Sequence, residues 1–234
     1  MKKTHHKRPP PVIAPASSPC LLHELCADGS LRADPEQARD VARWRTAQRE
    51  RLLKARGARS AAERARAAEG ILRLLDERVA GVRAGGPSVS VYWPIRAEPD
   101  LRSWMEKLCR SGVRVALPVA MALARPLIFR AWCPGSRLAR GLWNIPYPAE
   151  GEALVPDIVI APLVGFDRQG YRLGYGGGFF DRTLATLSPK PLTLGVGYSD
   201  AELSTIYPQP HDVPMDWVIT PSSAFAATAA KISP

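Results

Sequence analysis

The chain has 234 residues and a formal net charge of +10 at neutral pH, of which +7 lies in its first 80 residues. Its hydrophobic share of 46% is ordinary for a soluble protein, and no apolar run reaches the roughly 18 residues that a membrane helix needs. These values exclude a membrane-spanning chain. We expect one α/β domain with an appendage, located in the cytoplasm.

The excess of basic residues and the cysteines give little support for a nucleic-acid-binding surface or a cysteine-based metal site. A basic protein can bind nucleic acid, but small polyanions are attracted as well, and no basic patch interleaved with aromatic residues is present. We therefore expect no nucleic-acid partner. Cys20, His23 and Cys26 have a spacing that could suit a metal ion, but no fourth ligand lies nearby in the sequence, so a metal site there is disfavoured.

The N-terminal part is predicted to be an arm followed by a helix. Residues 1–37 are basic and rich in proline, so we expect a disordered arm there. A helix is expected over residues 36–55, where apolar residues recur at helical spacing. Arg45 and Arg49 are one turn apart on this helix. Two adjacent arginines repel each other, so they either face solvent or share an anion.

The next segments alternate between helices and strands. Ser60 and Glu63 form the capping-box pattern of a helix N-terminus, and apolar residues at helical spacing continue toward Gly81. A helix is also expected over residues 100–110. Strands are expected at residues 88–93, 113–119, 126–132, 157–164, 192–198 and 217–220. This alternation predicts an α/β fold with a largely parallel sheet, in which ligands bind at the carboxyl ends of the strands.

The stretch from Gly165 to Arg182 reads GFDRQGYRLGYGGGFFDR and contains six glycines. It follows an apolar run expected to be a buried strand, and it precedes a helical segment that ends near Leu187. A strand, a glycine-rich loop and a helix N-terminus together present backbone N–H groups to an anion, usually phosphate. Glycine lets the backbone approach the anion closely and adopt positive φ angles.

Two familiar phosphate motifs do not fit this stretch. A Walker A loop needs a lysine, which the stretch lacks, and a dinucleotide fingerprint starting at Gly174 would have Phe179 in place of its third glycine. The cationic partner is then Arg172, whose planar fork suits phosphate oxygens. Asp181 could hold Mg²⁺ against a triphosphate. The alternative is a glycine-rich turn that only caps a helix and leaves Asp181 in solvent.

This stretch resembles the signature loop of the 5-formyltetrahydrofolate cyclo-ligase family, whose members are also called methenyltetrahydrofolate synthetases. The family pattern is Gly-Phe-Asp, a gap, then Gly-x-Arg-Leu-Gly-x-Gly-x-Gly followed by two aromatic residues and an aspartate. Phe179 and Phe180 stand where tyrosines are commoner. The resemblance covers residues 38–221 and leaves residues 222–234 as a C-terminal tail. It implies a three-layer α/β fold, with a mostly parallel sheet flanked by helices and an N-terminal helical pair.

The resemblance also implies roles for individual residues. Arg45 and Arg49 would contact ATP from the first helix, with Arg45 replacing the usual lysine. The other ATP contacts would be Arg172, Leu173, Gly174, Tyr175, Gly176, Gly177, Gly178, Phe179 and Phe180. The folate would be bound by Trp93, Glu98, Tyr175, Gly176, Gly177, Gly178 and Phe179. Asp181 and Asp212 would hold Mg²⁺, and Arg172 would be the catalytic residue. The segment WNIPYP, residues 143–148, would either shape the pocket or pack in the core.

The implied reaction is the ATP- and Mg²⁺-dependent cyclisation of 5-formyltetrahydrofolate to 5,10-methenyltetrahydrofolate, with release of ADP and phosphate. The formyl oxygen would attack the γ-phosphate, and Arg172 and Mg²⁺ would stabilise the phosphate charge. We expect a monomer that binds ATP and the folate, polyglutamylated forms included. Two alternatives stay open: a related ATP-binding enzyme that acts on another small molecule, and a nucleotide- or nucleic-acid-binding module without enzymatic activity.

Overall fold

The computed structural model of the chain describes residues 35–81 and 85–228. The chain divides into two compact units, residues 1–47 and 48–234, and the boundary falls within helix α1 (Pro35–Gly57). The helix expected over residues 36–55 is confirmed. The expected arm over residues 1–37 lies outside the described residues, apart from its last three, with which α1 begins.

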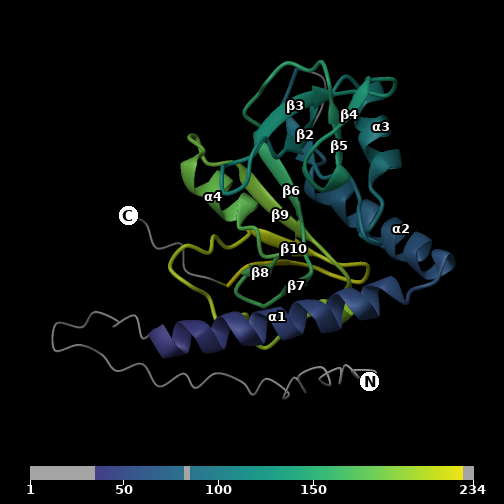
Figure 1. The fold of residues 1–234 in the computed structure, drawn as a ribbon. Helices are drawn as coiled ribbons and strands as arrows, with labels where there is room; N and C mark the ends of the chain where they lie inside the picture. Colours follow the sequence, from purple (N-terminus) through teal and green to yellow (C-terminus); the bar gives the residue numbers. More distant parts are fainter. Residues whose placement is uncertain (1–34, 82–84, 229–234) are drawn as a thin grey trace, which may run out of the picture. The chain divides into compact units, whose positions relative to one another are not determined.

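The second unit is organised around a seven-stranded sheet with the order β11–β10–β9–β6–β1–β2–β3 (Figure 1). The central strands β10, β9, β6, β1 and β2 pair in parallel, while β11 and β3 pair antiparallel at the two edges. The strands are β1 (Val89–Val91), β2 (Val115–Val119), β3 (Ile128–Trp132), β6 (Ile158–Pro162), β9 (Leu192–Val196), β10 (Trp217–Ile219) and β11 (Ala224–Ala226). The mostly parallel sheet predicted from the sequence is confirmed.

The central strands are apolar on both faces because helices cover both faces. In β6, Ile158 and Ile160 pack on one face and Val159 and Ala161 on the other. The first face packs against α2 (Ala61–Arg78) and α3 (Arg102–Arg110), and the second packs against α4 (Phe179–Thr186). Figure 1 shows α2 and α3 on one side of the sheet and α4 on the other. This is the expected three-layer arrangement.

Local sequence explains how α2 begins and how it meets α3. The Ser60 hydroxyl accepts a hydrogen bond from the Glu63 N–H, and the Glu63 carboxylate accepts one from the Ser60 N–H, which is the predicted capping box. Trp104 of α3 is buried, and its Nε1–H donates a hydrogen bond of 2.8 Å to Asp76 of α2. The two helices therefore cover their face of the sheet as a connected pair.

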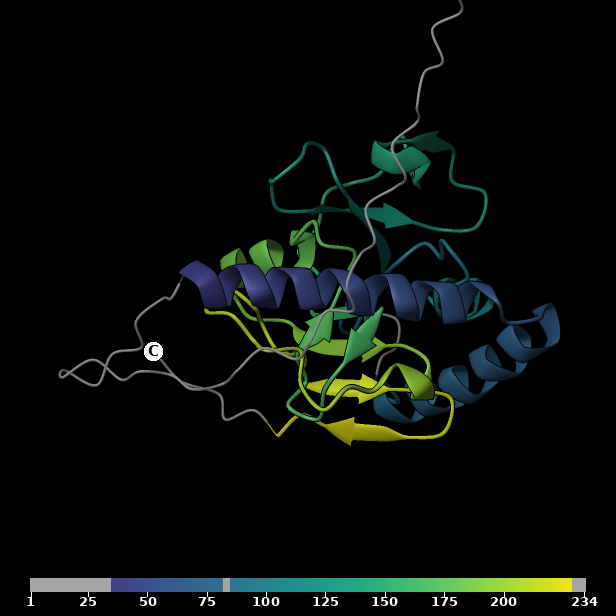
Figure 2. The ribbon, with the colours of Figure 1, turned by 60° about the horizontal axis from the view of Figure 1, so that its bottom comes forward.

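Several short strands are absent from the sequence-based prediction. β4 (Leu138–Arg140) pairs with β5 (Pro146–Pro148), and β7 (Gly165–Phe166) pairs with β8 (Arg172–Leu173). The glycine-rich loop follows the β7–β8 hairpin rather than the buried strand β6, which corrects the expected order of strand, loop and helix. The expected C-terminal tail, residues 222–234, contains β11, which lies beside β10 as the second yellow strand in Figure 2.

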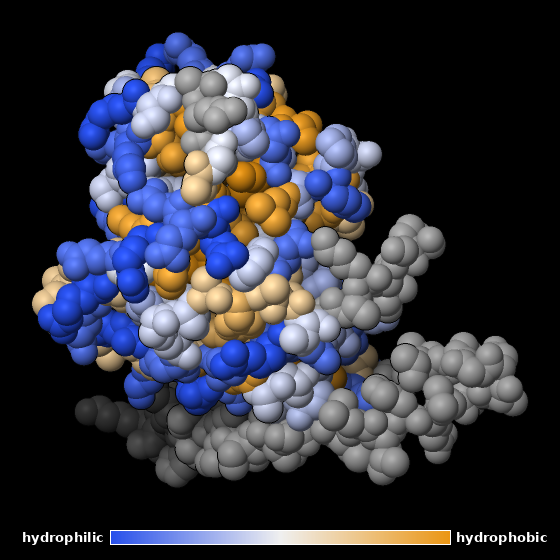
Figure 3. Space-filling model, turned by 180° about the vertical axis from the view of Figure 1, so that it is seen from behind, coloured by the Kyte–Doolittle hydropathy of each residue, from blue (hydrophilic) through white to orange (hydrophobic). Residues whose placement is uncertain are grey.

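Hydrophilic side chains cover much of the face shown in Figure 3, with smaller apolar areas between them. Among residues 35–81 and 85–228, no helix combines the length and the apolar character needed to cross a bilayer. Cys109 and Cys133 are free thiols. The group of Cys20, His23 and Cys26 lies outside the described residues.

Candidate active site

A cavity of about 390 Å³ opens at the carboxyl ends of the parallel strands. Residues at or just after the ends of β1, β2 and β6 line one part of it, namely Tyr92, Trp93, Val119, Ala120 and Pro162. The glycine-rich loop and the first turn of α4 line another part, namely Gly174, Tyr175, Gly177, Gly178, Phe179, Phe180 and Asp181. This is the place in the sheet where a ligand site was expected.

The glycine-rich loop is shaped by its backbone angles and by Arg49. Gly176 has a φ of +97° and Gly178 a φ of +62°, values that other residues rarely adopt. Arg49 Nε donates a hydrogen bond of 2.8 Å to the Gly174 carbonyl oxygen, and its guanidinium lies beside Gly176. α4 begins directly after the loop. Because a helix N-terminus carries unpaired N–H groups and partial positive charge, the loop suits an anion.

A buried charge cluster adjoins the loop. The Arg172 side chain, only 3% exposed, forms an ion pair with Asp181, with Nη2 and Oδ1 2.8 Å apart. Its Nη1 donates to the Val213 carbonyl oxygen at 2.9 Å, and the Val213 N–H donates to Asp181 at 3.1 Å. Burial lowers the pKa of Arg172, while the charges of Asp181 and Asp212 raise it. The guanidinium is thus paired with Asp181 and is also under the influence of the Asp212 charge.

Glu98 is the buried carboxylate of the cavity, with 5% of the residue exposed. Its Oε2 accepts a hydrogen bond from the Ile95 N–H at 2.8 Å, and its Oε1 accepts one from the Tyr175 hydroxyl at 2.7 Å. Burial raises the pKa of Glu98, and these hydrogen bonds and the charge of Arg56 oppose that rise. A carboxylate with acceptor capacity left on both oxygens can bind a ligand edge that carries two N–H groups.

The loop that carries Glu98 has an uncommon backbone. Arg96 (φ 47°) and Ala97 (φ 59°) both adopt positive φ angles although neither is glycine. Such conformations cost energy and persist where the surrounding structure holds them. The Tyr198 hydroxyl donates to the Ala97 carbonyl oxygen at 3.0 Å, and Arg56 Nε donates to the Arg96 carbonyl oxygen at 2.9 Å. The position of Glu98 therefore depends on residues from distant segments of the chain.

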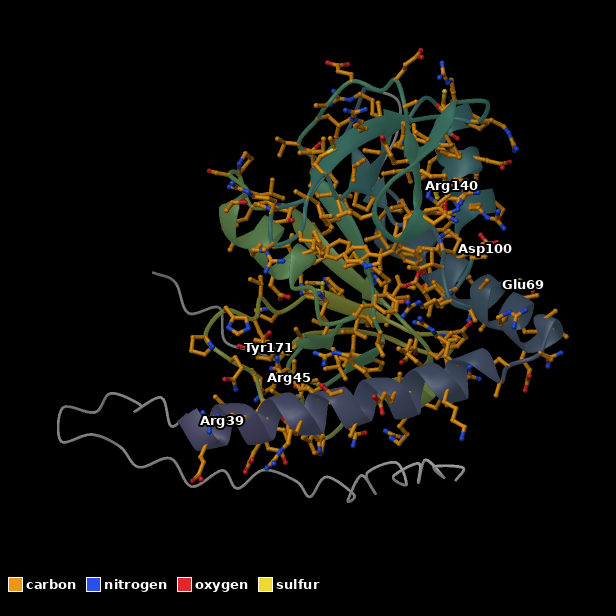
Figure 4. All side chains as sticks on the ribbon, viewed as in Figure 1. Arg39, Arg45, Glu69, Asp100, Arg140 and Tyr171 are labelled. Carbon is orange, nitrogen blue, oxygen red and sulfur yellow. The ribbon has the colours of Figure 1, made fainter. Side chains whose placement is uncertain are left out.

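The remaining wall of the cavity includes Trp143. Trp143 is 58% exposed, and its ring packs edge-on against the Phe179 ring, with the ring centroids 5.3 Å apart. Arg140, labelled in Figure 4, precedes this segment on β4, and its Nη1 donates to the Asn144 carbonyl oxygen at 3.0 Å. Ile145 and Tyr147 also line the cavity. The WNIPYP segment thus shapes the pocket, which was one of its two expected roles.

Comparison with known proteins identifies the family. A model of the 5-formyltetrahydrofolate cyclo-ligase family matches residues 41–221. The chain belongs to this family. It is accordingly an enzyme of the ligase class. The resemblance carried by the glycine-rich stretch is confirmed over nearly the predicted range.

Individual cyclo-ligases resemble the chain in sequence and in fold. The 5-formyltetrahydrofolate cyclo-ligase of Mycolicibacterium smegmatis is 35% identical over 170 residues, which cover 68% of this chain and 86% of that protein. The protein of the same name from Escherichia coli strain K12 is 37% identical over 145 residues, covering 59% and 80%. The NMR structure of Aquifex aeolicus 5,10-methenyltetrahydrofolate synthetase matches with a TM-score of 0.68 and 26% identity, over 81% of this chain and 96% of that one.

The cavity brings together most of the residues predicted for a cyclo-ligase site. Those that line it are Trp93, Glu98, Arg172, Gly174, Tyr175, Gly177, Gly178, Phe179, Phe180 and Asp181. Arg49 and Gly176 meet at the loop, as described above. Their contacts with ligands stay predictions.

Three other residues predicted for the site do not line the cavity. Leu173 is 1% exposed, and its side chain packs in the core with Phe166, so it does not line the cavity. Asp212 is not part of the cavity wall, and its connection to the site is its charge beside Arg172. Arg45 lies on the part of α1 that belongs to the first unit, so its contact with ATP stays a prediction.

Three arginines in or near the cavity are absent from the sequence-based prediction. Arg96 lines the cavity, and Arg56 is buried with 4% exposure. Arg182 donates a hydrogen bond to the Gly177 carbonyl oxygen, and its guanidinium lies 5.4 Å from the centre of the Phe179 ring. An arginine on a helix or a loop usually faces solvent. Only the three-dimensional contacts distinguish these three.

Proposed function

We propose that the protein converts 5-formyltetrahydrofolate to 5,10-methenyltetrahydrofolate, using ATP and Mg²⁺ and releasing ADP and phosphate. The observation that carries the proposal is that buried Glu98 and the glycine-rich loop line one cavity. A folate whose pterin reaches Glu98 and an ATP whose phosphates reach the loop would share this space. Holding two reactants side by side removes much of the entropic barrier to a reaction between them.

At the folate end, Glu98 would accept two N–H groups from the aminopyrimidine edge of the pterin. An ionised carboxylate makes strong, directional bonds to such a donor pair. Trp93 supplies a flat aromatic wall, and its ring is held by an edge contact with Trp132 at 6.3 Å between centroids. These residues would orient the folate so that its formyl group points toward the loop.

At the nucleotide end, the loop and two cations would bind the phosphates. Arg49 is anchored at Gly174 and Gly176, which places a positive charge at the middle of the loop. Arg172 lines the cavity just before the loop. Together with the N-terminus of α4, they give a site for three closely spaced negative groups.

The carboxylates of this end suit one magnesium ion. In phosphoryl-transfer sites Mg²⁺ is bound through one or two carboxylates together with substrate phosphates. Asp181 is ion-paired with Arg172, and the charge of Asp212 acts on the same guanidinium. Asp181 Oδ2 accepts no hydrogen bond from any described residue. The donor set therefore fits, with Asp181 and Asp212 as the residues that would hold the ion. When bound, Mg²⁺ would neutralise charge on the phosphates.

In the proposed reaction the formyl oxygen attacks the γ-phosphorus and ADP leaves. The nitrogen at position 10 then attacks the formyl carbon and loses its proton, and phosphate departs with the former formyl oxygen. No protein side chain forms a covalent bond. The chain orients both substrates, and Arg172 stabilises the charge that spreads over the transferred phosphoryl group.

The direct test is the rise in absorbance from the methenyl product when purified protein meets 5-formyltetrahydrofolate, ATP and Mg²⁺. Omitting ATP or chelating the metal should abolish the rise. A complete mixture without product would contradict the proposal. Thermal-shift titrations then separate the alternatives, because stabilisation by ATP without any stabilisation by the folate would favour a family member that acts on another small molecule.

Arg49→Ala should raise the KM for ATP much more than the KM for the folate. The variant removes a charged hydrogen-bond donor from the loop, which corresponds to roughly a tenfold or larger loss of phosphate affinity. Steady-state kinetics with each substrate varied in turn measures the two KM values. Arg51→Ala is the matched control, since Arg51 is exposed on the same helix. A rise in the folate KM alone would show that Arg49 does not contact ATP.

A further inference from the structure

We propose that Arg56 is a positioning residue that holds Glu98 and Tyr175 together and so links the folate end of the cavity to the phosphate loop. The inference rests on the proposed function and goes beyond it by assigning a role to a residue outside the cavity wall. Arg56 would act on the folate through Glu98 and Tyr175, without touching either substrate.

The contacts of Arg56 connect three separate segments. Its Nε donates to the Arg96 carbonyl oxygen at 2.9 Å, and its Nη1 donates to the Leu163 carbonyl oxygen at 3.4 Å. Its Nη2 donates to the Tyr175 hydroxyl. Arg56 thus bonds to the loop after β1, to the residue after β6 and to the glycine-rich loop. A buried guanidinium needs such partners, because leaving its donors unpaired is costly.

The charge of Arg56 is balanced through Tyr175. Among the described residues, no carboxylate lies within ion-pairing distance of Arg56. The Tyr175 hydroxyl accepts from Arg56 and donates to Glu98 Oε1, so the guanidinium, the hydroxyl and the carboxylate form one chain. This chain fixes the direction of the hydroxyl proton. It therefore orients Glu98 with one oxygen toward Tyr175 and the other toward the Ile95 N–H.

The same side chain supports the strained loop. Arg96 has a positive φ of 47°, and its carbonyl oxygen is the acceptor for Arg56 Nε. A conformation of this kind persists only where neighbours hold it. Removing Arg56 would release this carbonyl and the Tyr175 hydroxyl together. Glu98, two residues after Arg96, would then lose its fixed position.

Several charged and titratable groups face Glu98. Arg56 of α1 and Arg96 of the same loop lower the pKa of Glu98, although burial raises it more. The Tyr92 and Tyr175 side chains also face Glu98, and burial raises the pKa of both, so both stay neutral near pH 7. The charge of Arg56 partly offsets the effect of burial on the pKa of Glu98. Removal of this charge would therefore move the pKa of Glu98 further upward.

The test compares single and double variants with the wild type in the complete assay, with kcat/KM for 5-formyltetrahydrofolate followed against pH. Arg56→Met should lower kcat/KM by roughly 10- to 100-fold at neutral pH and move the acid limb of the profile to higher pH. Arg56→Lys keeps the charge but not the planar fork, so it should lower kcat/KM while the acid limb stays near its wild-type position. Arg51→Met should match the wild type within about twofold, since an exposed arginine contributes little.

Tyr175→Phe closes a double-mutant cycle with Arg56→Met. If Arg56 acts through the Tyr175 hydroxyl, its removal should cost much less in the Tyr175→Phe background than in the wild type. Additive losses in kcat/KM, with the acid limb unmoved, would show a purely structural role and overturn the inference. If Arg56→Met does not fold, Arg56→Lys decides in the same cycle.

The wild type separates this inference from the proposed function. A wild type that forms no methenyl product would overturn both. A wild type that is active, with Arg56→Met behaving like Arg51→Met, would overturn the role of Arg56 alone. An active wild type with coupled losses at Arg56 and Tyr175 would support it.

Discussion

Glu98→Gln should lower kcat/KM for 5-formyltetrahydrofolate by roughly 30- to 1000-fold, which corresponds to about 2–4 kcal/mol for one mismatched, buried, charge-assisted pair. The amide replaces one acceptor oxygen with an NH₂ donor. In the structure each Glu98 oxygen already accepts one hydrogen bond, from the Ile95 N–H or from the Tyr175 hydroxyl. An amide can accept a hydrogen bond from only one of these two donors, and its NH₂ group would face the other donor or the donor edge of the pterin.

Paired titrations measure this effect. The affinities for the folate and for ATP are determined on the wild type and on Glu98→Gln, and ATP binding should hardly change, because the phosphate loop is a separate element. Glu106→Gln on α3 is a matched control, since its ion pair with Arg110 is exposed and weak. Equal folate affinity in the wild type and Glu98→Gln would remove Glu98 from the folate site and favour another substrate.

The pKa of Glu98 adds a dependence on pH. Because burial raises this pKa, the carboxyl group is protonated at higher pH than an ordinary glutamate, and activity should be lost as the pH falls through the raised value. The folded state also binds this proton more tightly than the unfolded state, so ionisation of Glu98 lowers stability as the pH rises. The thermal midpoint of Glu98→Gln relative to that of the wild type should therefore be higher at neutral pH than in acid.

Asp181→Asn should lower turnover at limiting Mg²⁺ by on the order of 100-fold, because a neutral amide is a poor ligand for a hard cation. The fold should survive, since the amide oxygen can still accept the hydrogen bond from the Val213 N–H. The variant would, however, leave Arg172 without its nearest counter-charge. Part of the loss could thus arise from a displaced guanidinium rather than from the metal.

A magnesium titration distinguishes these two causes. If Asp181 holds the ion, the concentration of Mg²⁺ that gives half-maximal rate should rise in Asp181→Asn, and high Mg²⁺ should restore part of the rate. Asp200→Asn is a control, since Asp200 is an exposed carboxylate in an ion pair with Arg59. Unchanged half-saturation with a uniformly lower rate would assign Asp181 to holding Arg172 instead.

The main elements of the fold are predictable from the sequence because their signals are local. Apolar runs mark the central strands, and the Ser60–Glu63 capping box marks the start of α2. The β7–β8 and β4–β5 pairs are not predictable in this way. They contain two or three residues per strand, too few for a periodic pattern to show, and their pairing depends on the chain returning to the same place.

The site is predictable only in part for a similar reason. The glycine-rich loop is recognisable in the sequence because the positive φ angles at Gly176 and Gly178 favour glycine. Arg96 and Ala97 adopt positive φ angles without glycine, so nothing in the sequence marks the strained loop before Glu98. The hydrogen-bond partners of Arg56 lie far from it in the sequence, at separations of 40, 107 and 119 positions. On its helix Arg56 is one arginine among several, so the sequence does not distinguish it from the others.

The single cavity shared by Glu98 and the glycine-rich loop has a consequence for inhibitor design. A compound that carries a pterin-like donor edge at one end and an anionic group at the other could touch both ends at once. Once the first end is bound, the second contact forms within the complex, at an effective concentration of about the millimolar range for a short linker. Two weak ligands joined in this way would bind far more tightly than either does alone.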